Sequence, residues 1–143
     1  MKRSISFLVL LMMGTGIYAS KGLSSANSNS PSSLATGKKI EVYYFHFTRR
    51  CMTCTNVEKV SREAVETQFP DQVKTGDVSF KSINLDEKDG EAIGAKYKIE
   101  GQTLIVISGD KSVNLTDKGF MYANNSPDKL KAEIKKAVND MMK

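Results

Sequence analysis

One stretch of the chain joins a strand pattern to a C-x-x-C motif: residues 40–54 read Ile-Glu-Val-Tyr-Tyr-Phe-His-Phe-Thr-Arg-Arg-Cys-Met-Thr-Cys. The β-branched and aromatic residues 40–47 predict a strand, and the nearly unbroken apolar run indicates that both of its faces are covered. Residues 48–50 interrupt this run, and a helical pattern begins at the second cysteine. Apolar residues then recur at roughly helical spacing at Val57, Val60, Ala64 and Phe69. The sequence therefore predicts a central strand that leads through a short loop into a C-x-x-C motif at the start of a helix.

Further strands are expected downstream of this helix. Residues 78–85 and 103–108 are rich in β-branched and apolar side chains, which is typical of strands. Gly109-Asp110 predicts a tight turn, after which residues 111–115 return as the partner strand of a hairpin.

Two further helices complete the expected pattern. Residues 92–97 predict a short helix, and Ser126-Pro127-Asp128 predicts the start of the last one, with a capping Ser and Pro in the first turn. We expect Pro70-Asp71 to stop the first helix and residues 116–125 to form a loop. The order β-α-β-α-β-β-α predicts an α/β fold with a central mixed sheet and helices on both faces.

The exposed face of the first helix carries opposite charges four residues apart. Glu58 is followed by Arg62, and Lys59 is followed by Glu63. Pairs at this spacing are neighbours on a helix surface, so they favour a solvated face there.

Length and composition fit one globular domain. The chain has 143 residues, of which 40% are hydrophobic and 26% charged. Its net charge is +5, which falls to +3 without Lys2 and Arg3 of residues 1–19, and this mild excess is spread along the chain, so we expect no nucleic-acid partner. No run of 18 or more apolar residues is present, so we expect no membrane span after signal cleavage.

The first 37 residues are expected to lie outside this domain. Residues 1–19 combine a basic start, an apolar run and a small residue at Ala19, which is the layout of a secretory signal peptide. An uncleaved N-terminal anchor is the alternative. Residues 20–37 are Ser-rich and predict a flexible linker. The domain should therefore span residues 38–143, in a protein that is periplasmic or secreted.

The chain's two cysteines, Cys51 and Cys54, are its candidate reactive groups. Unpaired N–H groups and the macrodipole at a helix N-terminus favour a thiolate, so we expect Cys51 to be the nucleophile. Arg49 and Arg50 are nearby cations that favour the thiolate further. Cys54, one turn inward, is placed to resolve a mixed disulfide. The four residues predict a thiol–disulfide oxidoreductase.

Other uses of the same thiols stay open. Two thiolates suit a soft ion such as Cu(I) or As(III), with His46 as a third candidate ligand. His46 is otherwise a core residue of its strand, on the face opposite Phe45. A zinc site would need a fourth ligand, which these three residues do not supply. A purely structural disulfide is a further alternative, although so small a loop constrains the unfolded chain little.

The sequence resembles the thioredoxin-like superfamily over about residues 38–143. The resemblance rests on the strand, C-x-x-C and helix unit, on Asp86 followed by Ala95-Lys96-Tyr97-Lys98-Ile99, and on 102–106 leading into a hairpin. More narrowly, residues 43–54 are similar to the small secreted ArsF-type proteins of Bacteroides-like bacteria, which are labelled nitrophenyl compound nitroreductase subunits.

This resemblance implies a thioredoxin-like fold in a bacterial exported protein. We expect a protein thiol or disulfide partner in the cell envelope and a monomeric chain, with a non-catalytic accessory subunit as an alternative. No G-x-G-x-x-G loop is present, so we expect no flavin or nicotinamide and no cofactor beyond the redox-active disulfide.

Three positions depart from the thioredoxin pattern. Arg50 stands where the family usually has Trp, and Phe45 stands where many thioredoxins bury an acid. Gln102 replaces the cis-proline that faces the C-x-x-C motif. A cis bond costs about 2.5–4 kcal/mol for a residue other than proline, so we expect a trans peptide at Gln102.

Overall fold

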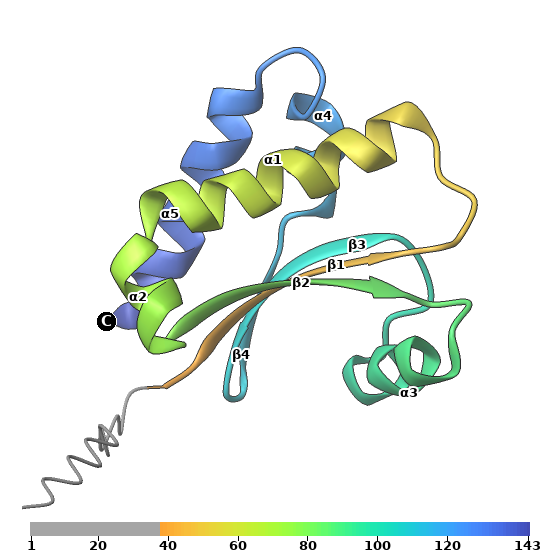
Figure 1. Cartoon of the computed structure of the whole chain (residues 1–143), viewed down its shortest axis with the longest axis horizontal. Coiled ribbons are helices and arrows are strands. Elements are labelled where there is room, and N and C mark those ends of the chain that lie inside the picture. The colour runs from red at the N-terminus through yellow and green to blue at the C-terminus, as the bar shows by residue number, and fades with distance from the viewer. Residues whose placement is uncertain (1–37) are drawn as a thin grey trace, which may run out of the picture. The chain divides into compact units, whose positions relative to one another are not determined.

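The computed structural model describes residues 38–143, which form a four-stranded sheet with helices (Figure 1). The expected signal peptide, residues 1–19, and linker, residues 20–37, lie outside the described residues. Within residues 38–143, no helix is long and apolar enough to cross a membrane.

The sheet is mixed, as expected. Its strands are β1 (Ile40–His46), β2 (Val78–Asn84), β3 (Thr103–Ser108) and β4 (Lys111–Asn114), in the order β2-β1-β3-β4. β1 pairs with β2 in parallel and with β3 antiparallel, and β3 pairs antiparallel with β4. The two-residue turn before β4 contains Gly109 at a φ of 59°, a left-handed conformation that glycine adopts at no steric cost.

Within residues 38–143, five helices connect and cover these strands. They are α1 (Met52–Gln68), α2 (Pro70–Thr75), α3 (Lys88–Tyr97), α4 (Thr116–Tyr122) and α5 (Pro127–Met142). In Figure 1, α1 and α5 lie together on one side of the sheet and α3 lies on the other.

The alternation of side chains along β1 explains this layering. Val42 and Tyr44 are fully buried in the core that α1 and α5 cover. Tyr43 and Phe45 point the opposite way and pack with Ile105 and with residues of α3. Both faces of the strand are therefore buried, which accounts for its unbroken apolar run. The parallel β-α-β unit followed by an antiparallel hairpin and a closing helix confirms the thioredoxin-like fold.

Pro70 ends one helix and starts another. Phe69 has φ −132° and ψ 44°, outside the helical region, because the residue before a proline avoids it. Pro70 then occupies the first turn of α2, where its missing N–H costs nothing. The expected stop of α1 is correct, and α2 is an element that the sequence did not predict.

The expectation of a loop over residues 116–125 is wrong, because α4 occupies most of it. Leu115, Gly119 and Ala123 are buried at a spacing of four residues. A Cβ at Gly119 would lie 3.2 Å from a methyl group of Val57, so glycine lets α4 approach α1 closely. Glycine has a low helix propensity, which explains why the sequence pattern did not indicate this helix.

We predict that Gly90→Ala in α3 destabilises the fold by about 3 kcal/mol, because overpacking against fixed backbone is costly. A Cβ at Gly90 would overlap the backbone carbonyl of Asn84 at the end of β2. Urea unfolding followed by circular dichroism measures the loss. Gly101→Ala is the matched control, since no atom lies within 4 Å of a Cβ built there. Equal stability of the two variants would contradict the close approach of α3 to β2.

Candidate functional site

Cys51 and Cys54 form a disulfide at the N-terminus of α1, with their Cα atoms 5.2 Å apart. Cys51 is the N-cap residue and is exposed, whereas Cys54 is only 3% exposed. The backbone N–H of Cys54 donates to Cys51 Sγ over 3.2 Å. The outer cysteine is therefore accessible to another molecule, while the inner one is shielded.

The electrostatic setting of this helix end favours a negative sulfur. Cys51 has extended backbone angles, φ −80° and ψ 167°, which point its side chain back at the first helical turn. That turn contains no acidic side chain. The positive end of the helix dipole is thus available to a Cys51 thiolate.

Arg50, the residue before Cys51, forms an ion pair with Glu58 of α1. Glu58 also accepts a hydrogen bond from Arg62 at 3.0 Å, the pair expected four residues apart. Burial raises the pKa of Glu58, but the hydrogen bonds from Arg50 and Arg62 outweigh it and hold that pKa below its usual value. Arg49 is exposed and has no ion pair within residues 38–143. Of the two predicted cations, Arg49 is therefore the exposed one without an ion pair in the described part of the chain.

The loop before Cys51 is anchored to the end of β2. The Thr48 N–H donates to Asp86 Oδ2 over 2.7 Å, and Asn84 Nδ2 donates to Thr48 Oγ1 over 3.0 Å. The Asp86 N–H in turn donates to Asn84 Oδ1. The hydrogen bonds from Thr48 lower the pKa of Asp86. Asp86, which the thioredoxin-like resemblance singled out, therefore helps to fix the loop that leads to the disulfide.

A second anchor comes from Asn124, which sequence reasoning missed. It follows α4 and forms hydrogen bonds with Thr53, between the two cysteines, and with Asn56. The sequence contains no signal for this contact, because it joins residues about 70 positions apart.

His46 is a core residue. It is 7% exposed, its Nδ1 donates to the Phe47 carbonyl over 3.0 Å, and its ring lies 6.0 Å from that of Tyr44 on the same face of β1. In the part of the chain from residue 38 on, no three His, Cys, Asp or Glu side chains are grouped to hold a metal ion.

The two remaining departures from the thioredoxin pattern, Phe45 and Gln102, lie in β1 and just before β3. Phe45 is fully buried on the α3 face of β1, so no acid occupies that position. Gln102 precedes β3, and its peptide is trans as expected, since residues 38–143 contain no cis bond. The buried Oε1 of Gln102 has no hydrogen-bond partner within that range.

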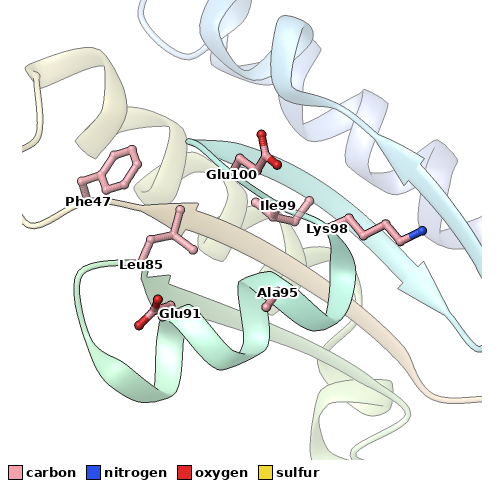
Figure 2. Close-up of a pocket in the computed structure, with 7 residues that line it drawn as sticks. All are labelled: Phe47, Leu85, Glu91, Ala95, Lys98, Ile99 and Glu100. Atoms are coloured by element: carbon pink, nitrogen blue, oxygen red, sulfur yellow. The ribbon is translucent and has the colours of Figure 1, made fainter.

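A cavity of about 540 Å³ opens between α3 and the adjoining end of the sheet (Figure 2). Its apolar lining comes from Phe47, Leu85, Ala95 and Ile99, and its charged lining from Glu91, Lys98 and Glu100. Phe47 belongs to the loop that leads from β1 to Cys51, so this cavity and the disulfide share one connecting segment.

Comparisons with known proteins return structural neighbours of low identity. A structure described as "Structure of a malarial protein" is 18% identical with a TM-score of 0.47, and the match covers 69% of this chain and 97% of that one. Thioredoxin from Fasciola hepatica is 23% identical with a TM-score of 0.45, and the match covers 71% and 83%. No protein-family model and no curated protein matches the sequence. The assignment to the thioredoxin-like fold therefore rests on the strand order, strand directions and helix placement of this chain.

We predict that Glu58→Gln lowers the free energy of unfolding by about 1 kcal/mol at neutral pH, the upper range for partly exposed ion pairs. The pKa of Glu58 in the folded protein lies below the usual value of a glutamate carboxyl. Its ion pairs therefore stabilise the fold above that value, and this stability is lost as the pH falls through the folded pKa.

The gap in stability between wild type and variant should accordingly close in acid. Urea unfolding at a series of pH values measures it. Glu66→Gln is the control, because Glu66 is exposed on the same helix and has no ion pair within residues 38–143. A gap that stays constant down to about pH 3 would show that the Glu58 charge is not involved.

Proposed function

We propose that this protein is an exported thiol–disulfide oxidoreductase in which Cys51 is the nucleophile and Cys54 the resolving residue. One observation carries the proposal: an exposed N-cap cysteine is bonded to a buried cysteine one helical turn away, in a thioredoxin-like fold. This asymmetry separates the two roles, because an external disulfide can approach only the outer sulfur.

The exchange takes place in two balanced steps. In the reduced protein, the Cys51 thiolate attacks one sulfur of the partner's disulfide, so a mixed disulfide forms and one partner thiolate leaves and takes up a proton. Cys54 then loses its proton and attacks Cys51 Sγ, which releases the second partner thiolate. The partner gains two electrons, and the Cys51–Cys54 dithiol becomes a disulfide. The reverse sequence oxidises a partner dithiol.

The surroundings of the disulfide support a protein as the partner. The exposed Arg49 favours an acidic group near the reacting bond. Met52, between the cysteines, is 80% exposed and offers an apolar contact beside Cys51. The cavity lined by Phe47 and α3 can accommodate an apolar side chain of the same partner.

Export and origin belong to the same proposal. The signal-like residues 1–19 and the disulfide both favour an oxidising compartment outside the cytosol. The similarity of residues 43–54 to ArsF-type proteins supports a bacterial periplasmic or secreted protein that acts as a monomer on an envelope protein.

We predict that Cys54→Ser traps a covalent complex with the partner, because the resolving thiol is absent and the mixed disulfide persists. Non-reducing electrophoresis of the variant expressed in a bacterial envelope should show adducts that disappear on reduction. Cys51→Ser is the matched control and should form few adducts, since Cys54 is buried. Equal trapping by the two variants would contradict the assigned roles, and absence of adducts from both would contradict exchange itself.

A further inference from the structure

The connection between α4 and α5 reaches the disulfide turn through the side chain of Asn124. Its Nδ2 donates to Thr53 Oγ1 over 2.8 Å, and its Oδ1 accepts from Asn56 Nδ2 over 2.9 Å. Thr53 and Asn56 are three residues apart, so they lie on the same face of α1. One amide group therefore bridges the first two turns of the helix that carries both sulfurs.

The segment that carries Asn124, from α4 to the start of α5, is packed against the rest of the fold. The preceding Ala123 is 5% exposed, and its N–H donates to the Gly119 carbonyl. Gly119 in turn lies against Val57 and Leu104, so α4 is seated between α1 and β3. The Ser126 N–H donates to the Tyr122 carbonyl and closes the connection. Asn124 is thus presented to α1 from a fixed position.

The hydrogen bond from Asn124 to Thr53 contributes more to the structure of the turn in the reduced protein than in the oxidised protein. In the oxidised protein the disulfide itself closes the turn from Cys51 to Cys54. In the dithiol this covalent closure is gone. Within residues 38–143, the bond from Asn124 to Thr53 is then the only side-chain hydrogen bond from elsewhere in the fold to a residue between the cysteines.

The geometry of the turn from Cys51 to Cys54 determines which hydrogen-bond donors a reduced Cys51 sulfur can reach. The Cys54 N–H already points at Cys51 Sγ over 3.2 Å, and a thiolate is a stronger acceptor than a disulfide sulfur. Fraying of the turn would remove this donor and the aligned N–H groups of the helix end. A group that holds the turn in place therefore stabilises the reduced state more than the oxidised one.

We propose that Asn124 is a positioning residue that holds the first turn of α1 and so stabilises the Cys51–Cys54 dithiol relative to the disulfide. It acts through Thr53 and touches neither sulfur. This inference rests on the proposed function and adds to it a residue far away in the sequence that sets the redox balance of the site.

The test compares the equilibrium of each full-length variant with glutathione. Asn124→Ala should shift the equilibrium towards the disulfide by about three- to tenfold, the size expected for one lost hydrogen bond, and tenfold equals about 30 mV for this two-electron couple. The pH profile of Cys51 alkylation should move to higher pH in the same variant. Asn125→Ala is the matched control, because Asn125 is the exposed neighbour and forms no side-chain hydrogen bond with residues 38–143.

Variants of Thr53 test the route of the effect. Thr53→Ser keeps the acceptor oxygen and should behave as wild type, whereas Thr53→Val removes it and should reproduce the shift of Asn124→Ala. In the Thr53→Val background, Asn124→Ala should add no further shift. A further shift of the same size there would overturn the inference.

Two more outcomes separate this inference from the proposed function. If wild type equilibrates with glutathione but Asn124→Ala behaves as Asn125→Ala, the positioning role is wrong and the oxidoreductase proposal stands. The same holds if Asn124→Ala loses equal stability to urea in both redox states, because such a loss marks a purely structural contact. If wild type itself does not equilibrate with glutathione, the proposed function and this inference both fail.

Discussion

The packing of α1 against β1 determines where the disulfide and the surrounding loops lie. Val57, Ala64 and Val65 are fully buried against a strand whose own residues Val42 and Tyr44 are fully buried. Because this interface fixes both the strand end and the helix axis, the loop between them must place Cys51 at the helix N-terminus. The location of the sulfurs thus follows from hydrophobic burial, and their chemistry follows from the helix end.

Polar contacts fix the loop before Cys51 and the first turn of α1 in the positions that this packing allows. Asp86 holds the loop before Cys51, and Asn124 holds the turn after it. Arg50 is paired with Glu58, so its charge is shared between the site and the helix surface. The structure thus places Cys51 at the N–H groups of the first turn of α1, with the exposed Arg49 two residues before it in the sequence. The sequence treats the two arginines alike, whereas within residues 38–143 the structure gives an ion pair to Arg50 and none to Arg49.

The sequence predicts the features that local patterns encode. The strand over 40–47, the helix after the C-x-x-C motif and the hairpin around Gly109-Asp110 all follow from periodicity and turn residues, and the structure confirms them. The Glu58–Arg62 pair also follows from helical spacing. Glu63, in contrast, pairs with Lys131 of α5 rather than with Lys59, because α5 packs beside α1 in the folded chain. Contacts of this kind depend on tertiary placement, as do the Asn124 bridge and the close seating of α4 on Gly119, and no local pattern encodes them.

The reduction potential of the Cys51–Cys54 bond decides whether this bond is a working redox couple. The potential is obtained by equilibrating the protein in defined glutathione buffers and quantifying the dithiol. Exchange proteins span about −120 to −270 mV, and our account predicts a reversible couple within that range. A potential below about −300 mV would identify an inert structural bridge and contradict the account.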